Sequence, residues 1–128
     1  MTEVLFDTWA WWEVAMGTRT GARLQARYLA KGKVVTSAWA LGEIVCKLEG
    51  RVAPEVLDTL LRRIRLAGRL VDVSPPIAVE GARLRASLRL KASHASLGDG
   101  VMLATARHIG ARLVSGDAAF VGERDVVR

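Results

Sequence analysis

Short apolar runs alternate with longer segments of helical periodicity along the whole chain. Each short run is rich in β-branched or other apolar residues, which is typical of buried strands. Each longer segment repeats its apolar positions with the helical period, and several end at a glycine or begin at a proline. The expected strands are 3–6, 33–37, 69–73, a run from 113 and 124–128. The expected helices are 8–16, 19–31, 38–50, about 55–68, 75 to about 91, and 97–109.

Strands that alternate with helices of this length predict βαβ units and a parallel sheet. The fold class is therefore α/β, a three-layer α/β/α sandwich with a central parallel sheet of about four to five strands. The 128 residues fit one domain, 1–128, without repeats or linkers. In open sheets of this kind ligands bind beyond the carboxyl ends of the strands. The residues at those ends are therefore the first candidates for function.

Composition narrows the class of protein. The net charge of +6 and the pI of about 10.4 make a polyanion a natural partner. No apolar run approaches the ~20 residues of a membrane span, and the first residues lack a signal peptide's basic start, so we expect a cytoplasmic protein. The single cysteine, Cys46, excludes an internal disulfide and is expected in the core beside Ile44 and Val45. Rossmann and Walker motifs are absent.

Four acids map to one edge of the predicted sheet. Asp7 ends the first strand, and Asp117 follows the strand that begins at Leu113. Asp99 lies in the first turn of the helix before that strand, so it starts from the same edge. Glu43 lies in the helix after the second strand, whose first turns also leave from that edge. These four carboxylates are expected to converge.

Each acid also has a purely structural explanation. Asp7 is well placed as a helix N-cap. Ser96 and Asp99 are spaced as a capping box. Glu43 and Lys47 form an i, i+4 pair typical of a solvated salt bridge. Asp117 follows glycine, a common turn sequence.

The mutual repulsion of four carboxylates indicates that the cluster binds a cation. Two carboxylates about 5 Å apart repel by roughly 3 kcal/mol at an effective dielectric near 20, so a group of them is costly unless a cation binds there. Oxygen ligands without cysteine or paired histidine favour Mg²⁺ or Mn²⁺. A hard divalent ion beside a basic surface indicates phosphodiester chemistry.

Three segments resemble the PIN domain family, and specifically the VapC-type toxins of prokaryotic toxin–antitoxin pairs. They are "VLFDTWAWWEV", "TSAWALGEIVCKLEG" and "SLGDGVMLATARHIGARLVSGDAAF", and the resemblance spans essentially the whole chain. It implies an endoribonuclease that depends on Mg²⁺ or Mn²⁺, with Asp7, Glu43, Asp99 and Asp117 as its acidic site. Ser115 stands where the family usually has threonine and would support the site with its hydroxyl. The resemblance also implies a small antitoxin as partner and a homodimer.

Basic side chains fall in two groups that an RNA backbone would require. Arg62, Arg65 and Arg69 are expected on one helical stripe, and Arg85 and Arg89 on another. A solvated face, with Asp58 paired to Arg62, explains the first group equally well. Trp11 and Trp12 would stack bases or, more simply, pack in the core.

Two other functions fit parts of the pattern. A catalytically silent relative would use the same fold to bind RNA or protein, but retained acids would repel RNA phosphates. A haloacid-dehalogenase-like phosphatase also carries an aspartate after its first strand, but it needs a second aspartate two residues on. That position is Trp9.

Overall fold

The structure is a computed structural model that describes residues 2–128. Its centre is a five-stranded sheet in the order β3-β2-β1-β4-β5, in which every pair of neighbours is parallel. The strands are β1 (Val4–Phe6), β2 (Val34–Ser37), β3 (Gly68–Val71), β4 (Arg112–Val114) and β5 (Val126–Val127). The predicted parallel sheet, including its fifth strand, is confirmed.

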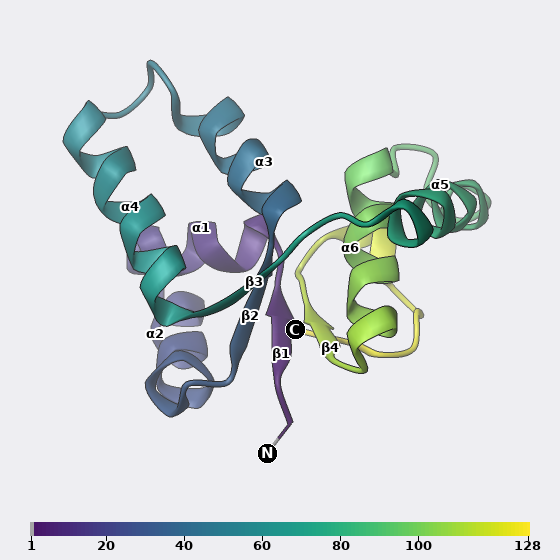
Figure 1. Cartoon of the computed structure of the whole chain (residues 1–128), viewed down its shortest axis with the longest axis horizontal. Helices are drawn as coiled ribbons and strands as arrows, with labels where there is room; N and C mark the ends of the chain where they lie inside the picture. Colours follow the sequence, from purple (N-terminus) through teal and green to yellow (C-terminus); the bar gives the residue numbers. More distant parts are fainter. Residues whose placement is uncertain (1) are drawn as a thin grey trace.

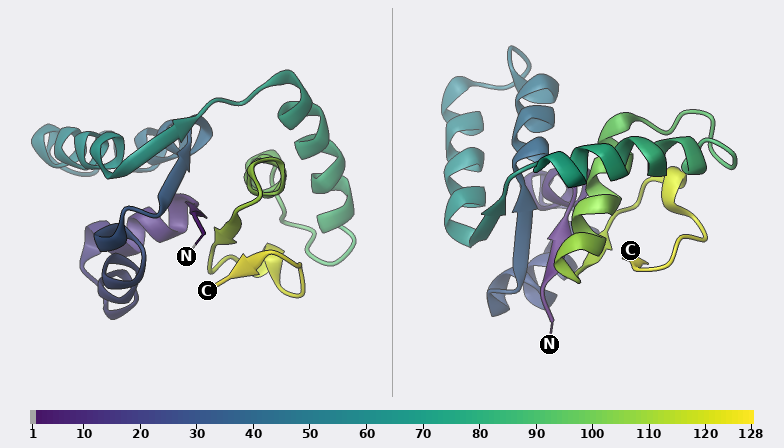
Figure 2. Two further views of the ribbon diagram at one scale, coloured as in Figure 1. Left: turned by 60° about the horizontal axis from the view of Figure 1, so that its bottom comes forward. Right: turned by 45° about the vertical axis from the view of Figure 1, so that its right-hand side comes forward.

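Helices lie on both faces of the sheet, so the three-layer prediction is also confirmed. The α-helices are α1 (Thr8–Met16), α2 (Arg19–Arg27), α3 (Ala38–Leu48), α4 (Pro54–Ala67), α5 (Pro75–Leu88) and α6 (Leu97–Ile109). Two 3₁₀ turns are η1 (Leu29–Lys31) and η2 (Ala118–Phe120). Figures 1 and 2 show α1, α2 and α4 on one side and α5 and α6 on the other. The segment after β3 crosses between the two sides (Figure 2).

Successive side chains of the central strands point to opposite faces of the sheet, as in any β-strand. Val4 and Phe6 belong to the core beneath α1, α2 and α4, whereas Leu5 packs against α5 and α6. Val34 and Val35 divide in the same way. Because both faces are covered at the centre of the sheet, β1 is wholly apolar and buried. The same packing fixes the level at which each strand ends, and so the position of the residues just after it.

Several predicted boundaries were wrong for identifiable reasons. Helix 19–31 stops at Arg27, because Tyr28 leaves helical geometry and buries its ring against Phe6, with the centroids 6.1 Å apart. The third strand is 68–71 rather than 69–73; a Cβ on Gly68 would lie 1.9 Å from the Val34 carbonyl oxygen, so only glycine fits beside β2 there. Helix α5 ends at Leu88, short of the predicted Lys91.

The position of β3 changes the expected grouping of arginines. Arg69 lies on this edge strand, where it pairs with Glu3 at 3.0 Å, so it does not share a helical stripe with Arg62 and Arg65 as expected.

Among residues 2–128, no helix has both the length and the apolar character needed to cross a membrane.

Candidate functional site

A cavity of about 1080 Å³ opens at the carboxyl edge of the sheet. Its walls come from the first turns of α1, α3 and α6, from the end of α3, and from the loops after β3 and β4. All four predicted acids line it: Asp7, Glu43, Asp99 and Asp117. The topology therefore brings together carboxylates that lie as far as 110 residues apart in the sequence.

Asp7 is the most deeply buried of these acids, with 6% of its surface exposed. It follows β1 and caps α1, because its Oδ1 accepts a 2.9 Å hydrogen bond from the backbone N–H of Ala10. Burial raises the pKa of Asp7 to about 7, and the charges of Asp117 and Glu43 push in the same direction. Hydrogen bonds from Ser115 and Ala10 oppose this rise in pKa. Desolvation by burial is therefore the main reason that the pKa of Asp7 is raised.

Glu43 projects from α3 into the same cavity. Its Oε1 accepts a 2.9 Å hydrogen bond from the hydroxyl of Thr8, the residue after Asp7. Desolvation by burial raises the pKa of Glu43, the Thr8 hydrogen bond lowers it, and the charge of Asp99 raises it again. Among residues 2–128, Glu43 and Lys47 do not form the salt bridge that their spacing suggested. The Lys47 ammonium lies instead over the Trp12 ring, 5.5 Å from its centroid. Glu43 is therefore held at the cavity by a contact with α1 as well as by its place on α3.

Asp99 and Ser96 do form the predicted capping box. The Asp99 backbone N–H donates to Ser96 Oγ at 3.1 Å, and the Ser96 N–H donates to Asp99 Oδ2 at 2.8 Å. Burial raises the pKa of Asp99, and Asp117 raises it further. The structural and the functional explanations of this residue are compatible, because the same box that starts α6 holds the carboxylate at the cavity wall.

Asp117 caps the short turn η2 through a 2.8 Å hydrogen bond from the Ala119 N–H to its Oδ1. Ser115, 2% exposed, supports this turn, because its Oγ accepts a 3.1 Å hydrogen bond from the Asp117 N–H, and its hydroxyl lowers the pKa of Asp7. The supporting role of Ser115 in a functional site stays a prediction. Phe120 is buried at the end of the turn and anchors it in the core beneath α6.

The acids share a cavity without forming a closed metal cage. Within residues 2–128, no three side chains of histidine, cysteine, aspartate and glutamate stand close enough together to hold a metal ion as they are. The donor set is nevertheless of the right chemistry, since the acids present only oxygen. The N-termini of α1, α3 and α6 also meet here, and their partial positive charge favours an anionic ligand.

Four further residues that line the cavity were not predicted from the sequence. Trp9 and Trp39 each occupy the second position of a helix, α1 and α3, and are half-buried. Lys47 and Arg51 supply positive charge at the far end of α3. His94, also missed, lies outside the lining residues but places its Nε2 3.5 Å from Asp117 Oδ1. None of these residues has a periodic signal that sets it apart from ordinary surface or core positions.

Cys46 is exposed and lines the cavity, so its predicted core position was wrong. Two residues along a helix turn by about 200°, and Ile44 faces the core, which sends Cys46 outward. Trp11, in contrast, is fully buried; its Nε1 donates to Thr36 Oγ1 at 3.0 Å, so the core interpretation holds for it.

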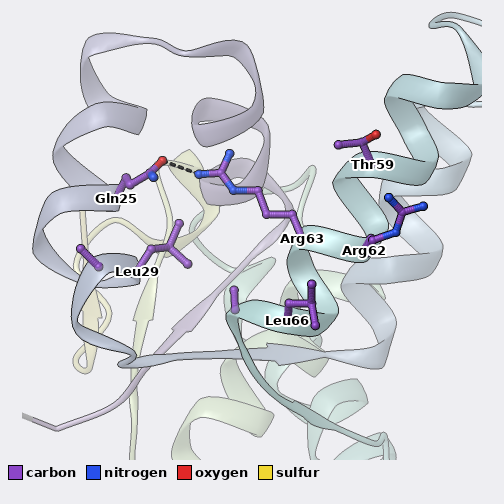
Figure 3. A pocket seen from close by; sticks show the side chains of 8 residues that line it. Gln25, Leu29, Thr59, Arg62, Arg63 and Leu66 are labelled. Carbon is purple, nitrogen blue, oxygen red and sulfur yellow. Dashed lines mark hydrogen bonds between the residues drawn. The ribbon is translucent and has the colours of Figure 1, made fainter.

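The arginines expected at an RNA backbone do not line the acidic cavity. Arg62 lies on α4 at a separate pocket of about 480 Å³ between α4 and the α2–η1 segment. In Figure 3, Arg63 reaches across this pocket to hydrogen-bond Gln25, whereas Arg62 points away from Gln25. Arg89 donates to the Ala95 carbonyl at 2.9 Å and thereby holds the loop before α6. Contact of Arg62, Arg65, Arg69, Arg85 and Arg89 with RNA stays a prediction.

The fold and this arrangement of acids are those of a small α/β domain with a carboxylate-lined cavity at the strand ends. The PIN domain family model matches residues 4–122, and the chain belongs to the PIN domain family. No curated protein matches the sequence.

Solved structures share the fold at low sequence identity. A toxin–antitoxin complex from Klebsiella pneumoniae has 21% identity and a TM-score of 0.78, and the match covers 98% of this chain and 97% of that one. VapBC2 from Rickettsia felis, bound to a DNA fragment from its promoter, has 17% identity and a TM-score of 0.75, with 98% and 96% covered. VapC20 of Mycobacterium tuberculosis, a toxin that cleaves the sarcin-ricin loop, has 23% identity and a TM-score of 0.72, with 98% and 100% covered.

Proposed function

We propose that this protein is an endoribonuclease that requires Mg²⁺ or Mn²⁺ and serves as the toxin of a VapBC-type toxin–antitoxin pair. The observation that carries the proposal is the meeting of Asp7, Glu43, Asp99 and Asp117 in one cavity of a PIN domain. Asp7, Asp99 and Asp117 are assigned as metal ligands, directly or through water. Glu43, held by Thr8, is assigned to the same metal site or to orienting the attacking water.

Burial of these carboxylates supports a cationic ligand. Folding places Asp7 where its charge is disfavoured, and neighbouring acids add to that cost. A divalent ion would offset the repulsion, and when bound it would supply the Lewis acidity that activates water and neutralises charge on the phosphate.

The chain itself prepares the carboxylates. Asp7, Asp99 and Asp117 each have one oxygen held by a backbone N–H, and Glu43 has one held by a hydroxyl. These bonds restrict the rotation of each carboxylate before any cation binds. Residues that are positioned in this way lose little conformational entropy on binding, which favours affinity. The helix N-termini beside them would then attract the phosphate.

The assignment to a toxin–antitoxin pair is supported by the solved relatives, among which are toxin–antitoxin complexes. An antitoxin partner, a homodimer and a cytoplasmic location belong to this proposal. A silent binding module is disfavoured, since it would gain nothing from a buried Asp7 whose pKa is raised towards neutrality. The phosphatase alternative needs a second aspartate two residues after Asp7, and that position is Trp9, whose ring packs on Gly116.

Cleavage of a mixed RNA pool tests the proposal. We expect cleavage with Mg²⁺ or Mn²⁺, none in EDTA, and loss of at least about 100-fold in rate for Asp99→Asn. Asp58→Asn, which changes an exposed acid on α4 outside the cavity, is the matched control and should cleave normally. Cleavage that persists in EDTA, or in Asp99→Asn at the wild-type rate, would contradict the metal mechanism.

The toxin assignment has its own test. Expression of the wild type should slow growth, that of Asp99→Asn should not, and a short open reading frame beside the gene should encode a protein that restores growth. Wild-type expression without effect on growth would remove the toxin assignment while leaving the nuclease assignment standing.

A further inference from the structure

The cavity contains an apolar wall that carboxylates and a phosphate do not require. Trp9, Trp39, Val73, Leu97 and Met102 all line it. The two indoles are the largest of these surfaces and are only half-buried. Each indole packs on the core with part of its surface and presents the rest to the cavity, where it can take a ligand group with a flat apolar face.

Trp9 is held in place by its neighbour Gly116. A Cβ on Gly116 would lie 2.5 Å from two ring carbons of Trp9, so only glycine permits the ring to pack against this loop. The loop carries Asp117, and Trp9 itself follows Asp7 and Thr8. The indole is therefore fixed beside two of the four acids, on the first turn of α1.

Trp39 occupies the equivalent position in the next βα unit. Phe6 pairs with Thr36 across β1 and β2, so Asp7 and Ser37 follow at the same level and Trp9 and Trp39 lie two residues beyond them. The Trp39 ring packs closely against the start of α6, since its Nε1 would lie 2.6 Å from a Cβ on Gly98. Both indoles thus pack against a glycine that neighbours one of the acids, Gly116 before Asp117 and Gly98 before Asp99.

Positive charge completes the cavity at the other end of α3. Lys47 lies one helical turn beyond Glu43, and Arg51 lies in the turn after the helix. Within residues 2–128, neither side chain takes part in an ion pair. Along α3 the cavity therefore presents Trp39, Glu43 and Lys47 on successive turns, with Arg51 beyond the end of the helix.

We propose that Trp9 and Trp39 form a stacking platform for an unpaired base of the RNA next to the cleaved bond, with a neighbouring phosphate at Lys47 and Arg51. This inference rests on the proposed function and assigns base stacking to two particular side chains of this protein. Bases of RNA stack on aromatic side chains only when they are splayed out of a helix. A nucleotide matches the indoles and the cations at once, whereas an apolar peptide side chain matches the indoles alone.

The test measures binding of a short fluorescently labelled RNA by anisotropy in the Asp99→Asn protein, where cleavage does not interfere. Trp9→Leu and Trp39→Leu should each raise Kd by about 5- to 100-fold, the range that loss of one stacked base produces. Trp9→Phe and Trp39→Phe should retain most of the affinity, because phenylalanine keeps an aromatic face. Thermal melting of each variant establishes that it is folded.

A second arm changes the RNA and compares the wild-type side chains with the leucine variants. Replacing one nucleotide at a time by an abasic residue should weaken binding at one or two adjacent positions, and that loss should disappear in the leucine variants. Equal binding of every abasic RNA, or of the leucine and wild-type proteins, would overturn the platform and indicate that the apolar wall serves a protein partner. If the platform fails while the wild type still cleaves RNA with Mg²⁺, the proposed function stands; failure of cleavage itself overturns the proposed function.

Discussion

The hydroxyl of Thr8 donates a 2.9 Å hydrogen bond to Glu43 Oε1, joining the first turn of α1 to the middle of α3. These residues are 35 positions apart in the sequence, yet they hold the two acids of the first two βα units in one cavity. Thr8 neighbours Asp7 in the chain, so any shift of α1 is transmitted to Asp7 and Glu43 together. Thr8 is in this sense a positioning residue for the candidate site.

Removing the Thr8 hydroxyl should impair activity more than stability. A hydrogen bond to a charged group contributes about 1.5 to 3 kcal/mol, so Thr8→Val should lower kcat by roughly 10- to 100-fold if Glu43 must be held in place. The loss of the donor also raises the pKa of Glu43 further, because this bond now lowers it. Single-turnover cleavage rates over a pH series measure both effects.

Thr8→Ser is the matched control, since it keeps the donor and removes only a methyl group. It should retain most of the wild-type rate and the wild-type pH profile. Equal rates for Thr8→Val and wild type would show that the Glu43 orientation does not depend on this bond.

The titration of Asp7 should make the metal-free protein less stable as pH rises. Its pKa is about 7 in the folded state and 3.8 for an ordinary aspartate, so the folded state holds the proton more tightly. The resulting stability is fully present below the ordinary value and is lost as pH rises through about 7. Asp7→Asn keeps an N-cap residue and cannot ionise, so at about pH 8 in EDTA it should melt on the order of 5 °C above wild type.

Melting curves of both proteins at several pH values, in EDTA, measure this difference. At about pH 4 the two melting temperatures should approach one another, because Asp7 is then protonated in the folded state. Asp58→Asn should follow wild type throughout. A constant difference between Asp7→Asn and wild type at all pH values would contradict the assigned pKa.

Mg²⁺ or Mn²⁺ should raise the melting temperature, and more so at about pH 8 than at about pH 6. A ligand of the folded state stabilises by about 2.7 kcal/mol at one hundred times its Kd. At the lower pH the ion must displace the proton of Asp7, which weakens apparent binding. Isothermal titration calorimetry in two buffers of different ionisation enthalpy would detect the released proton. Millimolar metal without effect on melting would contradict the cation site.

The close approach of α6 to α3 should be sensitive to one methyl group. A Cβ on Gly98 would lie 2.6 Å from Trp39 Nε1 and 2.9 Å from Glu43 Oε2. Gly98→Ala should therefore cost about 1 to 3 kcal/mol of stability and displace Glu43, which lowers the rate of cleavage. Chemical denaturation and cleavage assays measure the two losses.

Gly42→Ala is the control for this change, because it lies in α3 at the same cavity but its Cβ would meet nothing within 4 Å. It should stabilise the protein by about 0.5 to 1 kcal/mol through helix propensity alone. If Gly98→Ala behaved like Gly42→Ala, the contact between α6 and α3 would have to be looser than described.

Much of the architecture is contained in local pattern. The alternation of short apolar runs with helical segments predicts the parallel sheet, and sheet topology then places Asp7, Asp99 and Asp117 at one edge. Their capping roles and their place at the cavity are both real, so the two explanations that sequence leaves open for each acid turn out to be compatible.

Other features depend on contacts between distant segments. The departure of Tyr28 from helical geometry reflects its burial against Phe6, and the start of β3 reflects the space beside the Val34 carbonyl. The positions of Trp9 and Trp39 depend on Gly116 and Gly98, which lie far away in the sequence. Periodicity alone carries no information on such pairs.

The shared duty of the acids has a practical consequence for anyone who needs an inert form of this protein. Because Asp7 and Asp117 cap helical turns and Asp99 closes the capping box with Ser96, alanine at these positions would remove a cap hydrogen bond together with the charge. Variants that lose toxicity in a growth selection would then include proteins that fail to fold as well as proteins that fold but are inactive. Asparagine retains the side-chain oxygen, and it is the replacement from which a soluble, inactive preparation for partner capture or immunisation should be made.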